Sequence, residues 1–216
     1  MKSTRYRSKM KGTKVRTVGA LIFPGFELLD VFGPMEMFGL LEDRYDLHLV
    51  APAIGEVKSA QGLSAHADRE IGEPQRYDIV FVPGGRGTRV EIDNTALLDW
   101  ISKTAQQAEF VLSVCTGSAL LAKAGLLNGK RATTNKAAFT WVSEQGPMVE
   151  WIPKARWVED GKFFTSSGVS AGMDMALAAI AAMHGIETSR DVATWSEYGW
   201  HEDKDWDPFA EVHGLV

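Results

Sequence analysis

The chain has 216 residues, of which 45% are hydrophobic and 24% are charged, and this composition is typical of one folded domain. A single cysteine excludes an internal disulfide, and no run of about 18 or more apolar residues offers a membrane span. The net charge of -5 is uneven, since residues 1–16 hold seven of the 23 Lys and Arg residues, and the acidic remainder argues against nucleic acid as a partner.

Residues 1–14 form a basic segment, which we predict to be a disordered extension of a single α/β domain over residues 15–216. An arm that targets an organelle or touches nucleic acid is the alternative. The segment lacks the apolar stretch of a secretory signal, and one cysteine gives no sign of an oxidising compartment. We therefore expect a cytoplasmic protein.

Apolar strands and helices alternate along the first half of this domain. The predicted elements, in chain order, are strand 15–23, helix 27–41 distorted at Gly33-Pro34, strand 45–52, short edge strands and loops over 55–76, strand 77–82, and helix 94–108 with Asn94 as its N-cap. The strands read as nearly continuous apolar runs, which is typical of strands that are buried on both faces.

The second half continues the same alternation. Its predicted elements are strand 110–114, helix 117–125, a short strand over 130–134, helix 137–145, a hairpin over 155–167 and helix 171–185. The whole pattern predicts one doubly wound, mostly parallel sheet flanked by helices, a flavodoxin-like three-layer sandwich. In such folds the chemistry collects at the carboxyl ends of the strands.

The final stretch, WSEYGWHEDKDWDPF, is both aromatic and acidic. We expect it to form an arm laid over the core or over a second subunit, because each aromatic side chain buries a large area. A wall of the substrate pocket is the alternative function of this arm.

Cys115 lies where an apolar strand turns into a helix, in the sequence SVCTGSAL. Nucleophile elbows place their reactive residue at such a turn, in a strained backbone conformation. The N–H groups at the start of the following helix favour a thiolate, so the thiol pKa should lie below its usual value of about 8.5. A small, buried and inert thiol is the alternative.

Two other strand ends contribute candidate site residues. Gly84 and Gly85 follow strand 77–82, and the N–H groups of Gly85 and Thr116 predict an oxyanion hole. Glu27 and Asp30 begin helix 27–41. Asp30 lies among apolar residues, so burial should raise its pKa and make it a proton donor to the sulfur. Glu27 is explained by the helix dipole alone, or takes this role if it lies closer to the sulfur.

Four segments together resemble the ThiJ/PfpI superfamily, a cysteine-centred branch of the class I glutamine amidotransferase-like folds. They are FPGFELLDVFGP, DIVFVPGG, SVCTGSALLAKAGLLNGKRATT and FFTSSGVSAGMDMAL, and the resemblance covers residues 15–184. It is strongest to isonitrile hydratase-like members, which pair an acid in L-D-x-x-G-P with Cys-Thr-Gly. The resemblance implies Cys115 as nucleophile, Asp30 as its acid/base partner, Thr116 as a neighbour that shapes the pocket, and a homodimer.

The chain departs from this family at one position. Many members have a histidine after R-A-T-T, where this chain has Asn135. A catalytic histidine would have to come from the tail, where His201 is the candidate. No pair of histidines shows metal-ligand spacing, so we predict neither a metal nor a cofactor.

These features predict a cysteine-dependent hydratase or hydrolase, a lyase or hydrolase in class, that acts on a small molecule. Hydration of an isonitrile to an N-substituted formamide needs one nucleophile and one acid. A redox- or electrophile-sensing stress protein without turnover is one alternative. Glyoxalase or deglycase activity is another, although the missing histidine argues against it.

Helix 27–41 is the predicted contact of the homodimer. Its apolar residues are spaced too widely for one core-facing stripe. The residues expected at the interface are Met35, Met37, Phe38, Leu40 and Leu41.

Overall fold

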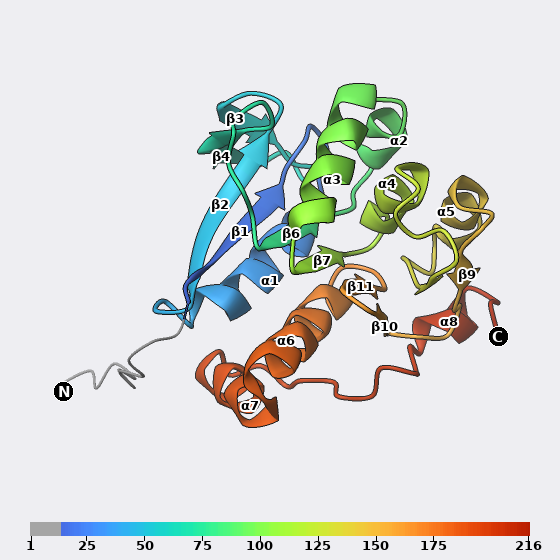
Figure 1. Ribbon diagram of the computed structural model, residues 1–216. Coiled ribbons are helices and arrows are strands. Elements are labelled where there is room, and N and C mark those ends of the chain that lie inside the picture. The colour runs from blue at the N-terminus through green and yellow to red at the C-terminus, as the bar shows by residue number, and fades with distance from the viewer. Residues whose placement is uncertain (1–13) are drawn as a thin grey trace.

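The computed structural model describes residues 14–216, and a seven-stranded sheet runs through their centre (Figure 1). The strand order is β10-β11-β7-β6-β1-β2-β5. All neighbouring strands are parallel except β10, which pairs antiparallel with β11. The predicted basic extension lies outside the described residues except for Lys14, whose Nζ is 2.6 Å from a carboxyl oxygen of Asp78.

The strands of this sheet are β1 Arg16–Leu21, β2 Tyr45–Ala51, β5 Arg69–Glu70, β6 Ile79–Val82, β7 Phe110–Ser113, β10 Trp157–Asp160 and β11 Phe163–Ser166. Two small sheets accompany it: the hairpin β3 Gly55–Lys58 with β4 Ser64–Ala67, and the pair β8 Arg131–Ala132 with β9 Glu150–Trp151. Every residue of β6 is buried, as expected for an apolar strand in the middle of a parallel sheet.

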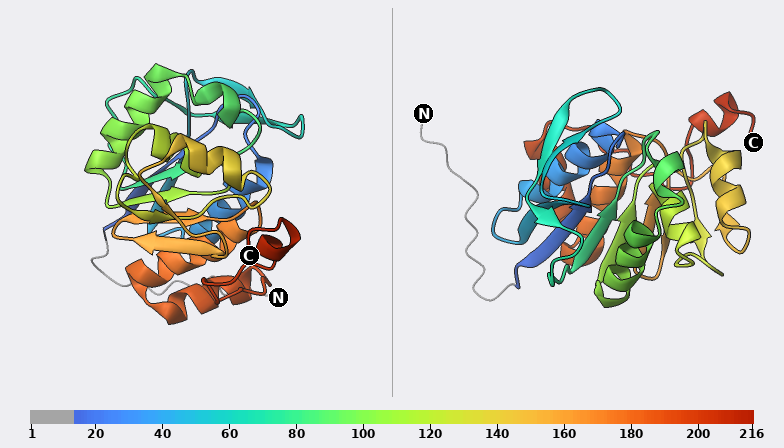
Figure 2. Two further views of the ribbon diagram at one scale, coloured as in Figure 1. Left: turned by 90° about the vertical axis from the view of Figure 1, so that its right-hand side faces the viewer. Right: turned by 90° about the horizontal axis from the view of Figure 1, so that it is seen from above.

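Helices cover both faces of the sheet (Figure 2). One layer contains α1 Leu28–Gly39, α6 Ala171–His184 and α7 Ile186–Trp195, and the other contains α2 Thr88–Glu91, α3 Thr95–Gln107, α4 Gly117–Lys123 and α5 Phe139–Gln145. A short helix, α8 Phe209–Val212, ends the chain. The three layers confirm the predicted doubly wound α/β fold.

Helix α1 differs from its prediction in two ways. It runs through Pro34 without interruption, and the predicted interface residues Met35, Met37 and Phe38 are buried. The reason is that α1 packs both on β2 and against α6, so two of its flanks are covered rather than one. The exposed apolar residues of α1 and its end are Leu29, Phe32 and Leu40.

Several short elements carried no clear sequence signal. Helix α2 and strand β9 have 4 and 2 residues, too few for a periodic pattern. Helix α7 begins after Gly185, which has a φ of 90° and separates it from α6. None of the helices within residues 14–216 has the length and apolar character needed to cross a membrane.

Candidate functional site

The loops that follow β1, β6 and β7 meet at one edge of the sheet, because these three strands are parallel neighbours. The backbone N–H of Glu27 donates to the carbonyl oxygen of Gly84 at 2.9 Å, and the N–H of Val114 donates to that of Val82 at 3.1 Å. The sequence-predicted residues Asp30, Gly84 and Cys115 are therefore brought together.

Cys115 has the backbone conformation of a nucleophile elbow. Its φ of 56° lies in the left-handed region, which is costly for a residue with a side chain. Its N–H donates to Ser167 O at 3.1 Å, and its carbonyl oxygen accepts from Thr134 Oγ1 at 2.8 Å. A side chain at Gly117 would collide with the carbonyl oxygens of the β6 end, so the turn requires glycine there. The predicted strain at Cys115 is confirmed.

The Cys115 thiol is buried, with 7% of the residue exposed. Burial raises its pKa above the usual value, and the negative charges of Asp30 and, more weakly, Glu27 act in the same direction. The N–H groups of Thr116 and Val169 oppose this by hydrogen bonding to the sulfur. The predicted lowering of the thiol pKa is therefore wrong, because desolvation outweighs the N–H groups at the helix start.

Asp30 is fully buried. Its Oδ2 accepts from Gly84 N–H at 2.8 Å, while its Oδ1 has no hydrogen-bond partner. Burial raises the pKa of Asp30 to about 8, the Gly84 N–H lowers it, the Glu27 charge raises it, and a side-chain interaction with Cys115 lowers it slightly. The carboxyl is therefore mostly protonated at neutral pH, as predicted, and it can donate a proton.

The two glycines bind protein groups rather than leaving their N–H groups free. Gly84 N–H is used by Asp30, and Gly85 N–H donates to Thr116 Oγ1 at 3.2 Å. The Thr88 hydroxyl lies 2.7 Å from Gly85 O and 3.0 Å from Thr116 Oγ1. Of the two N–H groups predicted to form an oxyanion hole, that of Gly85 is thus taken by a protein side chain, whereas that of Thr116 lies at the sulfur together with the N–H of Val169.

Sequence reasoning missed Val169, which lies in the loop between β11 and α6. Its φ of 47° is a strained value for a β-branched residue, and its N–H faces the Cys115 sulfur. The segment FFTSSGVSAG contains the end of the predicted hairpin and the start of the predicted helix 171–185, and neither pattern indicates a site residue between them. No sequence pattern indicates a positive φ at a valine, so the signal was absent.

Asn135, which replaces the family histidine, lies against the same loop. Its Oδ1 accepts from Ala138 N–H at 3.0 Å, and a side chain at Gly168 would collide with its Nδ2. Its observed hydrogen bond therefore serves the start of α5 rather than the Cys115 thiol.

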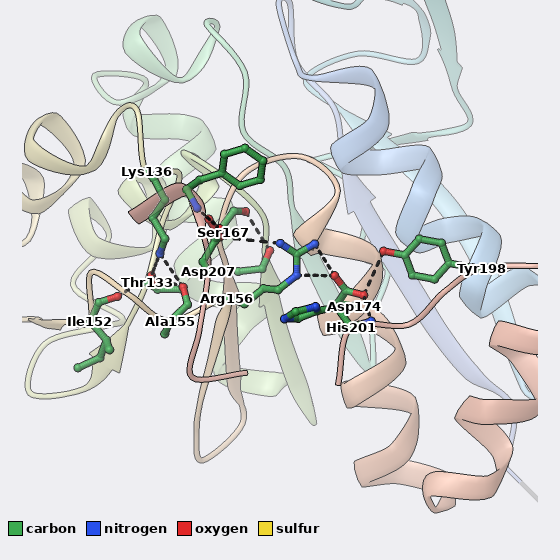
Figure 3. A network of polar contacts seen from close by, with 12 residues as sticks. Thr133, Lys136, Ile152, Ala155, Arg156, Ser167, Asp174, Tyr198, His201 and Asp207 are labelled. Atoms are coloured by element: carbon green, nitrogen blue, oxygen red, sulfur yellow. Dashed lines mark hydrogen bonds and ion pairs between the residues drawn. The ribbon is translucent and has the colours of Figure 1, made fainter. Parts of the chain in front are cut away.

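The C-terminal arm is held to the core by buried charges (Figure 3). Asp174 Oδ2 accepts from Arg156 Nε at 2.6 Å, and Asp174 Oδ1 accepts from Tyr198 OH and from His201 N–H, each at 3.0 Å. His201 thus contacts this network through its backbone, while the residue is exposed. This arrangement does not support His201 as a base for Cys115.

The site as a whole presents a thiol and a carboxylic acid, both shifted toward their neutral forms. The chemistry available is nucleophilic attack coupled to proton transfer. No three His, Cys, Asp or Glu side chains within residues 14–216 are arranged to hold a metal ion.

Residues 16–182 match the model of the DJ-1/PfpI family. The chain is 38% identical over 182 residues to an isonitrile hydratase of Pseudomonas putida, covering 84% of this chain and 78% of that protein. It is 28% identical over 177 residues to the HTH-type transcriptional regulator CdhR of Pseudomonas aeruginosa, covering 80% of this chain but only 52% of the regulator. A solved ThiJ/PfpI family protein from Pseudomonas syringae superposes with a TM-score of 0.79 at 28% identity, covering 93% of this chain and 80% of that one.

Proposed function

Because the chain belongs to the DJ-1/PfpI family, we propose that it is an enzyme in which Cys115 attacks a small molecule, and that its reaction is the hydration of an isonitrile to an N-substituted formamide. The observation that carries the proposal is the fully buried Asp30, whose pKa is raised to about 8 by that burial, beside the strained Cys115. The 38% identical isonitrile hydratase supports the choice of substrate.

The proposed reaction uses both neutral groups. Asp30 gives its proton to the terminal carbon of the isonitrile while it takes the proton of the Cys115 thiol, and the sulfur bonds to that same carbon. The product of this step is a thioimidate on Cys115. Water then adds to the carbon, and one of its protons goes to the nitrogen. The C–S bond breaks, the other proton of the water goes to the sulfur, and the formamide is released. The unpartnered Asp30 Oδ1 gives the acid a second oxygen for this exchange.

The proposal is tested by incubating the pure protein with simple alkyl and aryl isonitriles and measuring the N-formyl product. Wild type should turn over, Cys115→Ala should be inactive, and Asp30→Asn should lose about 100-fold or more, as expected for removal of a general acid. Wild-type rates equal to those of Cys115→Ala for every isonitrile would reject isonitrile hydration.

The site argues against the redox-sensor alternative. Cysteines that sense oxidants are accessible thiolates, whereas Cys115 is buried and its pKa is raised. The asparagine at position 135, where many family members have a histidine, continues to argue against glyoxalase or deglycase chemistry.

We propose that the protein acts as a homodimer in the cytoplasm. The interface we now assign is the exposed face of the α1 segment with Leu29, Phe32 and Leu40, which replaces the buried Met35 and Phe38 of the sequence-based prediction. These three side chains are spaced by three and eight residues, which places them on one side of the helix, where they can form one apolar patch for a two-fold contact.

A further inference from the structure

The turn of the β3–β4 hairpin is docked onto the loop that leads from β1 into α1. Gly25 N–H donates to Lys58 O at 2.8 Å, and Ala60 N–H donates to Phe26 O at 2.8 Å. Within the turn, Ser59 N–H donates to Leu63 O at 2.8 Å. The turn therefore has a defined shape and a fixed position at the start of the helix that carries Asp30.

Gln61, in this turn, bonds to the N-cap residue of α1 and to the first residue of the helix. Its Oε1 accepts from Leu28 N–H at 3.1 Å, and its Nε2 donates to Glu27 Oε1 at 2.6 Å. Glu27 occupies the N-cap position but its own side chain caps nothing, so Gln61 supplies the acceptor that the helix start needs. The same amide fixes the direction of the Glu27 carboxylate.

Glu27 is joined to the reacting pair through Gly84. Glu27 N–H donates to Gly84 O at 2.9 Å, and Gly84 N–H donates to Asp30 Oδ2 at 2.8 Å. A Cβ at Gly84 would lie 2.9 Å from Cys115 Cβ, so glycine is needed for the chain to approach the cysteine this closely. The backbone of Glu27, the carboxyl of Asp30 and Cys115 therefore meet at one glycine, and the negative charge of Glu27 acts on both Asp30 and Cys115.

We infer that Gln61 is a positioning residue that holds the Glu27 carboxylate beside Asp30 and Cys115, and that Glu27 thereby sets the pH at which this pair reacts. The inference rests on the proposed role of Asp30 and Cys115 as the reacting groups. A negative charge at this place favours the neutral forms of both, which are the forms that the proposed reaction starts from.

Other charged groups near the pair are exposed or paired. Lys58 and Arg86 are exposed, and Arg86 Nη2 donates to Ala60 O at 2.9 Å. On α6, Asp174 is neutralised by Arg156. The loop over 167–170 and the start of α4 contribute N–H groups but no charged side chain.

The test is the rate of Cys115 alkylation by iodoacetamide against pH, followed by intact mass, since Cys115 is the only thiol. Glu27→Gln should move the midpoint of the profile down by about 0.5–1 pH unit, the size of effect that one nearby, partly solvated charge produces. Gln61→Ala should move it in the same direction by less, because the carboxylate can then swing into solvent. Gln61→Asn, which is too short to reach both partners, should do the same.

The double variant, Glu27→Gln with Gln61→Ala, decides whether Gln61 acts by positioning Glu27 or independently of it. If Gln61 acts through Glu27, Gln61→Ala adds no further shift in the Glu27→Gln background. Glu36→Gln, an exposed acid on the same helix, is the control and should leave the midpoint unchanged. Gln61 variants that lower the melting temperature but keep the wild-type midpoint would overturn the inference, as would fully additive shifts.

The same experiment separates this inference from the proposed function. A protein that turns over no isonitrile but shows these shifts loses only the proposed reaction. A protein that hydrates isonitriles with an unmoved midpoint in Glu27→Gln loses only the role of Glu27 and Gln61.

Discussion

Asp30→Asn should lack a loss of stability that wild type shows as the pH rises, so the free energy of unfolding of the variant should increase relative to that of wild type. In the folded protein burial raises the pKa of Asp30 to about 8, against 3.8 for the ordinary carboxyl. Between these values the folded state holds a proton that the unfolded chain has released. Wild-type stability therefore falls as the pH rises through this interval and levels off above it. An asparagine does not ionise, and its Oδ1 can still accept from Gly84 N–H.

The magnitude follows from the width of the interval. Each pH unit within it costs the wild type about 1.4 kcal/mol. The difference in the free energy of unfolding between Asp30→Asn and wild type should therefore change by about 3 kcal/mol in favour of the variant between pH 5 and pH 7. All other titrating groups are the same in the two proteins, so the difference isolates Asp30.

The assay is urea unfolding of both proteins at pH 5, 6, 7 and 8, with Glu36→Gln as a matched control on the same helix. The exposed Glu36 should give a difference from wild type that changes by less than about 0.5 kcal/mol over this range. A constant difference between Asp30→Asn and wild type would mean that Asp30 is already ionised in the folded protein at neutral pH. The proposal that Asp30 donates a proton would then be wrong.

Three further predictions concern stability and assembly. Asp174→Ala should lower the free energy of unfolding by about 3–5 kcal/mol, because a buried cation loses its partner; the exposed Asp203→Ala should cost under about 0.5 kcal/mol in the same urea titration, and equal costs would contradict the account of the network. Gly117→Ala should lower the free energy of unfolding by about 1–3 kcal/mol, because the added methyl group collides with backbone carbonyl oxygens. Gly199→Ala, whose added methyl group meets no atom within 4 Å, should leave the free energy of unfolding nearly unchanged. Phe32→Glu should reduce the mass found by light scattering from that of a dimer to the 23.7 kDa of one chain, and a wild-type monomer would refute the α1 interface.

The sheet and the elbow at Cys115 could be predicted because their signals are local. Apolar runs that end at Gly84 or Cys115 identify strand ends, and parallel pairing then brings those ends together without further information. The raised pKa of Asp30 was also accessible, since a carboxyl flanked by Leu29 and Val31 has little chance of solvation.

The protonation of Cys115 could not be predicted because its burial is a property of distant segments. The loop with Val169 covers the sulfur, and it lies more than 50 residues further along the chain. The same holds for Gln61, whose place on α1 depends on how the β3–β4 hairpin docks. The buried side of α1 was predicted wrongly because the periodicity of α1 does not reveal that a second helix, α6, packs against it.

The arm network in Figure 3 has a consequence for how the chain folds during synthesis. Arg156 and Asp174 are buried, and some of their polar partners come from the C-terminal arm. These partners are Tyr198, the backbone N–H of His201, and Asp207. Arg156 O in turn accepts from Ser167 N–H, and Ser167 O accepts from the N–H of Cys115. Because the ribosome releases the N-terminus first, the contacts that support the backbone of Cys115 stay incomplete until residue 207 has emerged. Reactivity at Cys115 should thus be one of the last properties that the growing polypeptide acquires.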